Sequence, residues 1–341
     1  MKLRVGIVGL GANWDARYRP ALRALADRFQ VRAVCAEVAA KANQVAREFD
    51  AEPVHGFRTL AARSDIDALL LLSPAWFGPL PILAACDFAK AVYCAAAVAV
   101  DGERADEIKQ RVEAAGIAFT AEFPRRQSPA TLRLKELIAT RLGAPQMLFC
   151  HARRQIERQP KSLTPLGGRE PMTDDLMELV DWCCFIMDRP LRSVWGVEHR
   201  RLGGERDYQM MSLEFAAPEE RPDGWDATGA PMAQISCGRY LPPEWQEAVA
   251  FRPPAELQVC CERGIAFVDL PSTLVWFDEA GRHLESLDQD RPVGEQLLTQ
   301  FHRAVTSLVR RTQDLEDAYR ALHVVMAARQ SAKEGRRIAL E

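Results

Sequence analysis

The sequence predicts an α/β protein in which a doubly wound parallel sheet is followed by an α+β domain built on a large, mostly antiparallel sheet. Two patterns predict it. The first third of the chain alternates short apolar runs with helical patterns, whereas beyond Met147 longer strand-like runs follow one another. Apolar strands separated by helices are typical of a parallel sheet covered on both faces, and right-handed crossovers make such a sheet doubly wound. We expect residues 1–123 to form the first domain and residues 124–341 the second.

Short apolar runs supply the strands of the first domain. Leu3 to Val8 is the clearest, because it contains three β-branched residues and ends at Gly9, as buried strands do. Between the runs, apolar residues recur at helical spacing, as at Val38, Ala42 and Val45. The expected strands are residues 3–8, 31–35, 68–72, 91–94 and 117–121, and the expected helices are residues 38–49, 79–88 and 102–115, with another opening at Ala21.

The second domain has a different order of expected elements, in which strands follow one another without helices between them. We expect residues 155–169, which are polar and rich in proline and glycine, to form a loop. A helix follows over 173–187, with Thr173 as its N-cap. The other expected helices are 132–138, 295–310 and 315–332, and the expected strands are 193–201, 209–215, 233–240, 257–261, 265–270 and 273–277.

The helices of the second domain would cover one face of its sheet. The other face must be covered or solvated, and in a chain this apolar we expect a homo-oligomer in which a second subunit covers it. An alternative left open is that the final helix, residues 313–334, packs back on the first domain.

Composition narrows the classes of function. The 341 residues are 48% hydrophobic and 27% charged, which suits a globular protein of two domains. Basic and acidic residues are interspersed and the net charge is −3, so we expect no nucleic-acid partner. We expect no signal peptide, and no apolar run reaches the roughly 18 residues of a membrane span. The nine cysteines lack paired metal spacing, which favours reduced thiols in a cytoplasmic protein.

The opening strand, Gly-x-Gly turn and helix have the parts of a dinucleotide-binding site. Gly9 would permit the turn, and Gly11 would let the backbone approach a pyrophosphate that rests on helix N–H groups. Trp14 stands where the fingerprint has its third glycine, so its indole would either crowd the helix against the sheet or cover the nucleotide. The alternative is a plain strand-to-helix turn, because a lone Gly-x-Gly is a weak signal. The expected cofactor contacts here are Gly9, Gly11, Ala12, Asn13 and Trp14.

Two further positions are candidates for cofactor contact. Glu37 follows the second strand, and its carboxylate would accept hydrogen bonds from a ribose diol, which favours NAD over NADP. The alternative is a solvated charge one residue out of register. Ser73 and Pro74 end a strand at the expected ligand crevice, where they would contact the nicotinamide ribose or simply end the strand.

The chain as a whole resembles a known family. The segments that carry the resemblance are VGIVGLG, VRAVCAEVAAKANQVAREF, DALLLLSPAWFGPLPILAACDFAKAVYC and TQDLEDAYRALHVVMAARQSAKEGRRI. They are similar to segments of the Gfo/Idh/MocA oxidoreductases, the relatives of glucose–fructose oxidoreductase and inositol dehydrogenase. The resemblance implies an N-terminal Rossmann domain that holds NAD or NADP and a second domain that presents a substrate, usually a sugar or polyol.

This chain departs from the family at its catalytic positions. The family's Glu-Lys-Pro signature, whose lysine assists binding and proton transfer, falls on Ala95, Ala96 and Ala97. The family's Asp-x-Gly-x-His-x-x-Asp helix falls on Asp174 to Asp181, and Glu178 stands in place of its acid/base histidine. The family's histidine after the Ser/Thr-Pro turn is Gly78, and its acidic residue at the end of the second strand is Ala36.

Three carboxylates share one face of the helix expected at 173–187, because Asp174, Glu178 and Asp181 are spaced i, i+4 and i+7. Beside a cleft they would repel one another, so at least one would bind a proton more tightly than in water. A glutamate tuned in this way acts as an acid or base. The alternative is a solvated acidic face. We expect no metal, because no histidine lies at ligand spacing in this helix.

Arginines at the domain junction complete the candidate site. Arg125 and Arg126 would hold an anionic substrate or a cofactor phosphate, since a guanidinium binds planar anions bidentately; the alternative is surface charge. His151 is more typical of a packed histidine than of a catalyst.

The leading hypothesis is an NAD(P)-dependent oxidoreductase with an unusual catalytic set: Glu178 as the base, with Asp174, Asp181 and Arg125 beside it, acting on a small polar, sugar-like substrate. One alternative is a non-catalytic dinucleotide- or ligand-binding sensor, and another is an assembly scaffold.

Overall fold

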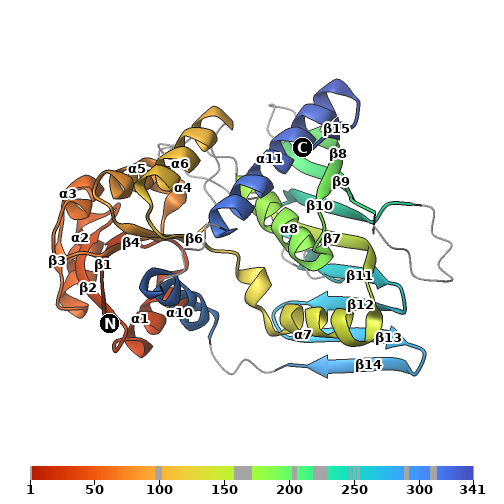
Figure 1. Ribbon diagram of the computed structural model, residues 1–341, viewed down its shortest axis with the longest axis horizontal. Helices are drawn as coiled ribbons and strands as arrows, with labels where there is room; N and C mark the ends of the chain where they lie inside the picture. Colours follow the sequence, from red (N-terminus) through yellow and green to blue (C-terminus); the bar gives the residue numbers. More distant parts are fainter. Residues whose placement is uncertain are drawn as a thin grey trace. The chain divides into compact units, whose positions relative to one another are not determined.

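The computed structural model describes residues 2–96, 102–156, 171–201, 206–217, 229–245, 247–248, 251, 254–287, 292–307 and 313–340. They form two compact units (Figure 1). So far as it is described, the first unit consists of residues 1–124 and 290–320. The second consists of residues 125–160, 171–289 and 321–341.

The first unit is built on a six-stranded sheet in the order β3-β2-β1-β4-β5-β6. Every neighbouring pair is parallel, and this order is that of the doubly wound Rossmann sheet. The predicted fold class of this part of the chain is therefore confirmed. The strands are β1 (Leu3–Val8), β2 (Phe29–Cys35), β3 (Glu52–Pro53), β4 (Ala68–Leu71), β5 (Ala91–Cys94) and β6 (Phe119–Ala121).

Helices cover both faces of this sheet. Side chains of η1, α1, α2 and α10 share one core with alternate residues of β1, and α1 and α10 lie side by side (Figure 1). On the opposite face Gly6 leaves room for Leu60 of α3. The helical segments are η1 (Trp14–Tyr18, one turn of π-helix), α1 (Arg19–Ala24), α2 (Ala39–Glu48), α3 (Phe57–Ala61), α4 (Pro74–Phe77), α5 (Leu80–Asp87), α6 (Gly102–Ala115) and α10 (Val293–Thr306).

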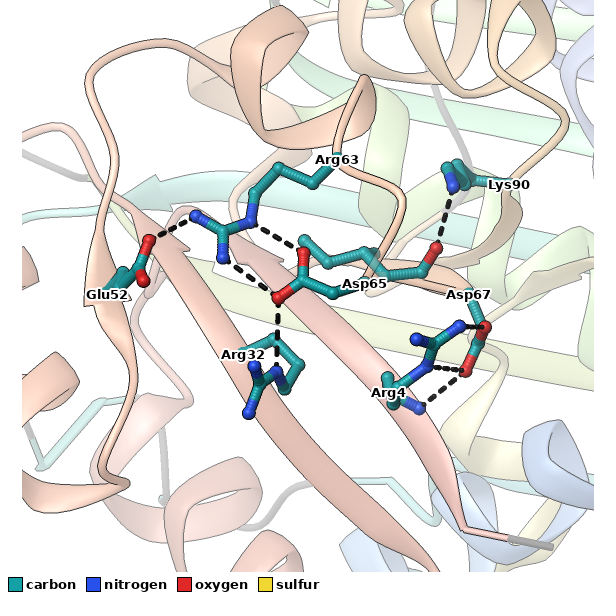
Figure 2. Close-up of polar contacts among 8 residues, drawn as sticks. Arg4, Arg32, Glu52, Arg63, Asp65, Asp67 and Lys90 are labelled. Atoms are coloured by element: carbon teal, nitrogen blue, oxygen red, sulfur yellow. Dashed lines mark hydrogen bonds and ion pairs between the residues drawn. The ribbon is translucent and has the colours of Figure 1, made fainter.

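Charged side chains are paired where β1 and β4 begin (Figure 2). The Arg4 side chain donates to both carboxylate oxygens of Asp67, at 2.5 and 3.0 Å. Nearby, Asp65 accepts hydrogen bonds from Arg63 at 2.9 Å and from Arg32 at 3.2 Å. Ligands bind at the carboxyl ends of parallel strands, so these pairs at the opposite end contribute to stability.

We expect the Arg4–Asp67 pair to stabilise the fold at neutral pH and to stop doing so in acid. The hydrogen bond from Arg4 lowers the pKa of Asp67, although burial acts in the opposite direction. Such a carboxyl contributes stability above its unfolded pKa of about 4 and loses it as the pH falls through the folded pKa. Asp67→Asn should therefore lower the urea midpoint at pH 7, and its difference from wild type should shrink below about pH 4. A difference that stays constant in acid would contradict the assignment.

The second unit is built on a nine-stranded sheet in the order β14-β13-β12-β11-β7-β10-β9-β8-β15. Neighbours are antiparallel except β10 and β7, which are parallel. The sheet is therefore mixed and mostly antiparallel, as predicted. Its strands are β7 (Pro145–Gln155), β8 (Leu191–Arg200), β9 (Arg206–Phe215), β10 (Met232–Leu241), β11 (Leu257–Cys261), β12 (Gly264–Asp269), β13 (Thr273–Asp278), β14 (Gly281–Ser286) and β15 (Ile338–Ala339).

Helices of this unit pack on its sheet. Helix α8 (Pro171–Met187) contacts β7 and β10, and α7 (Pro129–Leu137) contacts β12 and β13. Helix α11 (Gln313–Glu334) belongs to this unit from Ala321 onward, and there it approaches β8 so closely that a Cβ at Gly196 would overlap the carbonyl group of Ala328. Two short turns, η2 (Pro124–Gln127) and η3 (Ile138–Leu142), flank α7.

One local prediction was wrong. Thr173 does not cap α8, because the helix already begins at Pro171, a residue that the first turn of a helix accepts. The Thr173 hydroxyl instead accepts a hydrogen bond of 2.6 Å from Arg329 of α11. The loop expected at 155–169 lies mostly outside the described residues, as does Ala97.

Candidate functional site

The glycine loop closes onto the end of β4. Gly9 and Gly11 have φ angles of +73° and +62°, which favour glycine. A Cβ on Gly9 would overlap the Cβ of Ser73, and one on Gly11 would overlap the carbonyl oxygen of Leu72. The Gly9 N–H donates to the Cys35 carbonyl at 2.7 Å. The loop thus touches the carboxyl ends of β2 and β4, and glycine is required by both conformation and space.

The indole of Trp14 packs into the core instead of over the loop. The residue is 6% exposed, and its ring meets Phe49 edge-on at 5.9 Å. Residues 11–13 remain exposed. The N–H groups of Arg17 and Tyr18 both donate to the Asn13 carbonyl, at 2.9 and 3.3 Å. An exposed backbone turn that leads into a helix is the usual place for a pyrophosphate.

The end of β2 lies beside this loop. Val8 of β1 pairs with Cys35, and Glu37, partly exposed, follows two residues later. Burial raises the pKa of the Cys35 thiol, and the charge of Glu37 raises it further. Glu37, the candidate ribose ligand, therefore lies just after the strand next to the Gly-x-Gly turn, near the place where a dinucleotide-binding fold has its acidic residue.

Ser73 and Pro74 begin α4 directly behind the loop. The Ser73 carbonyl accepts the N–H groups of Trp76 and Phe77 at 3.1 and 3.3 Å, and Pro74 occupies the first turn. The structure thus brings the candidate contacts of β1, β2 and β4 together at one edge of the sheet. At the end of β5 the thiol of Cys94 donates to the Ala96 carbonyl at 2.8 Å.

Asp174, Glu178 and Asp181 all lie on helix α8, and arginine side chains pair with Glu178 and Asp181. Asp181 is buried and accepts a bidentate ion pair from Arg126, with Nε at 2.6 Å. Glu178 is partly exposed, and its Oε2 lies 3.5 Å from Nε of Arg125. Asp174 is partly buried. These guanidinium groups offset the repulsion expected among the carboxylates.

Arg125 is held between two glutamates. Its Nη1 donates to Glu256 at 2.7 Å, and its guanidinium carbon lies 5.1 Å from the ring centre of Trp182. Burial disfavours the charged form of Arg125, but Glu178 and Glu256 outweigh it and the pKa is raised. The arginine therefore stays cationic beside Glu178. Because both partners are anionic, this cluster is poorly suited to an anionic substrate.

Sequence reasoning missed several of these partners. Glu256 lies 131 residues from Arg125, and no local pattern marks it. Asp175 is a neighbour of the predicted acidic face, but it turns to β10 and pairs with Arg239 at 2.6 Å. Glu122, a buried carboxylate just after β6, could have been noticed in the sequence, because it is a single charged residue between apolar ones.

His151 lies on β7, where its Nδ1 is 2.8 Å from the hydroxyl of Ser236 on β10. Burial lowers its pKa. This placement matches the packed-histidine interpretation. Among the described residues, no group of three or more His, Cys, Asp or Glu side chains could hold a metal ion. Within the same residues, no helix is both long and apolar enough to cross a membrane.

Solved structures share this fold along the whole chain. An NAD-binding oxidoreductase from Klebsiella pneumoniae has 18% identity and a TM-score of 0.78, over 100% of this chain and 99% of that one. An aldose–aldose oxidoreductase from Caulobacter crescentus, complexed with glycerol, has 15% identity and a TM-score of 0.82, over 100% of both chains. At these identities the similarity is one of fold.

Sequence comparison finds two similarities. Inositol 2-dehydrogenase from Acidothermus cellulolyticus is 29% identical over 202 residues, which are 58% of this chain and 58% of that protein. Residues 3–123 match the Gfo/Idh/MocA family, described as an oxidoreductase family with an NAD-binding Rossmann fold. The similarity to the Gfo/Idh/MocA oxidoreductases thus lies in this N-terminal domain, and the chain spans 58% of the length of the inositol 2-dehydrogenase that it matches.

Proposed function

We propose that this protein is an NAD(P)-dependent oxidoreductase that acts on a small polar, sugar-like substrate. The observation that carries the proposal is the glycine loop, in which Gly11 lies against the Leu72 carbonyl with no room for a side chain and residues 11–13 are exposed. The inositol 2-dehydrogenase relative supports a polyol or sugar as the substrate class.

The residues at the loop suit a dinucleotide. Gly9, Gly11, Ala12 and Asn13 would hold the pyrophosphate through their backbone, with Trp14 placing the start of the helix. Ser73 and Pro74 would contact the nicotinamide ribose. Glu37 would accept hydrogen bonds from the adenosine ribose and repel a 2′-phosphate, so we propose NAD as the better cofactor. Bound nicotinamide supplies the acceptor for a hydride.

The acidic face of α8 would supply the proton chemistry. Glu178 replaces the family's histidine and would take the proton of the substrate hydroxyl. Arg125, 3.5 Å from Glu178, would steady negative charge that develops on the substrate oxygen. Asp181 fixes Arg126, and Asp174 would add a polar contact at the start of the face.

Binding and turnover can be measured separately. NAD, NADH, NADP and NADPH are titrated by calorimetry, and sugars and polyols are then screened for the absorbance of reduced nicotinamide. We expect NADH to bind and at least one polyol to be oxidised. Binding of none of the four nucleotides would refute the proposal.

The second candidate is a dinucleotide-binding sensor without turnover. Two observations favour it. Ala95 and Ala96 stand where the family's signature has its glutamate and its catalytic lysine, and Arg125 is already paired with two glutamates. Tight nucleotide binding, with no turnover on any substrate of the screen, would support it over the enzyme.

We also propose a homo-oligomer formed through the nine-stranded sheet. Apolar side chains exposed on its strands include Trp195, Val197, Met147 and Leu284, the last 62% exposed. Pairing places Trp195 and Val197 opposite Ser212 and Met210 of β9, on the same face. An apolar sheet face of this kind needs a cover in water.

Charge on this face should dissociate the oligomer. We expect the double variant Trp195→Glu, Val197→Glu to elute at monomer mass in size-exclusion chromatography with light scattering, where wild type elutes as an oligomer. The control is Leu132→Glu, at an exposed site on α7, which should keep the wild-type mass. A monomeric wild type would contradict the proposal.

A further inference from the structure

A buried carboxylate stands immediately after β6 in the first unit. Glu122 is 1% exposed, and its backbone N–H donates to the Cys94 carbonyl of β5 at 2.9 Å. Its side chain accepts hydrogen bonds from the hydroxyls of Tyr18 and Tyr93, the latter at 2.7 Å, and an ion pair from Arg17. None of the roles assigned above uses this cluster.

Burying these charged groups costs free energy that an apolar core would not lose. Burial raises the pKa of Glu122, while Arg17 and the two tyrosines oppose that shift by favouring the charged form. Replacing a buried ion pair by packed apolar groups is often neutral or stabilising. What the pair can provide in exchange is a fixed geometry for the groups that it joins.

Two of the three donors come from the turn that follows the glycine loop. Arg17 and Tyr18 belong to η1, and their backbone N–H groups converge on the carbonyl of Asn13. Asn13 is the last exposed residue of the loop. The Glu122 carboxylate thus holds the side chains of Arg17 and Tyr18, and the backbone N–H groups of the same two residues hold the Asn13 carbonyl at the end of the loop.

The other side of the cluster is buried and packed against the sheet and α10. Tyr93 lies on β5, between β4 and β6 of the sheet, and its ring packs edge-on against Tyr18 at 6.3 Å and Phe301 of α10 at 5.5 Å. Gly294 of α10 lies against the backbone of Arg17, where a Cβ would come within 2.7 Å of its carbonyl oxygen. The turn is therefore held between β5, β6 and α10.

We propose that Glu122 is a positioning residue for the cofactor: it holds η1, and with it the backbone of residues 11–13, in the conformation that receives the pyrophosphate. This inference rests on the proposed dinucleotide binding. It goes beyond it by assigning part of the cofactor affinity to a side chain that the cofactor does not touch.

The test compares Glu122→Gln with a matched variant in the same unit. Glutamine keeps the size and removes the charge. Asp67→Asn makes the same change in the Arg4 pair at the other end of the sheet (Figure 2). NADH and ADP-ribose are titrated by calorimetry into each protein, at a temperature where circular dichroism shows all of them to be folded.

We expect Glu122→Gln to weaken both ligands about tenfold, equivalent to about 1.4 kcal/mol, and Asp67→Asn to bind them as wild type does. ADP-ribose reports on the pyrophosphate without the nicotinamide. Tyr18→Phe removes a single donor and serves if Glu122→Gln does not fold; it should weaken both ligands by a smaller factor.

Lowered stability with unchanged affinity in the Glu122 and Tyr18 variants would overturn the inference, because the cluster would then be structural only. A wild-type protein that binds neither NADH nor ADP-ribose would instead refute the proposed function itself. The two failures are thus distinguishable in one set of titrations.

Discussion

Glu178→Gln is expected to abolish turnover while leaving the affinity for NADH unchanged. Glutamine has the shape of glutamate but cannot accept the proton of a substrate hydroxyl. General acid–base catalysis contributes about 10²- to 10⁴-fold, so kcat should fall by that factor. The measurement is the initial rate with the best substrate from the polyol screen, together with a calorimetric titration of NADH.

A matched control lies at the end of the same helix. Asp188 follows α8 and pairs with Lys135 at 3.1 Å, and its side chain is largely exposed. Asp188→Asn changes the charge near the helix as much as Glu178→Gln does, yet should keep wild-type kcat. If Glu178→Gln retained activity, the acid–base role would belong to another group.

Gly11→Ala should strongly weaken nucleotide binding. The residue has a φ angle of +62°, where an L-residue pays about 1–2 kcal/mol. Its new methyl group would also overlap the Leu72 carbonyl oxygen, so the loop must move away from β4. The strain alone corresponds to roughly a 5- to 30-fold change in an equilibrium, and the overlap adds to it. Calorimetry with NADH measures the loss.

A control variant at Gly335 separates the effect of backbone strain from the effect of steric overlap. Its φ angle is +66°, and a Cβ placed there would have no neighbour within 4 Å among the described residues. Gly335→Ala should therefore lower the thermal midpoint slightly and keep the affinity for NADH. Wild-type NADH affinity in Gly11→Ala would show that the loop does not carry the pyrophosphate.

Local patterns were enough to predict most of the architecture. The parallel sheet follows from uninterrupted apolar runs such as Ala68–Leu71, which are buried at every position. Helix α10 was assigned to the second half of the chain, yet its apolar residues Leu298 and Phe301 complete the core of the first unit. An amphipathic pattern states that a helix has an apolar face, but not which distant sheet receives it.

The sequence named candidate residues on several elements, but it predicted which of them lie together from spacing only within one element. Helical spacing placed Glu178 and Asp181 together, because the period of a helix is fixed. Their arginine partners come from η2, with Arg126 lying 55 residues from Asp181. Such pairings are set by tertiary packing, to which neither spacing nor composition responds.

The burial of Trp14 has a consequence for recognising proteins of this type. Glycine at that position is normally a spacer between helix and sheet, whereas here an indole beside Phe49 occupies the interior and the first turn is widened to a π-helix. A pattern scan that demands all three glycines would pass over this chain, although its loop keeps the left-handed turns of the first two. Trp14→Gly would restore the consensus glycine but leave a cavity beside Phe49, so in this chain the indole is part of the core.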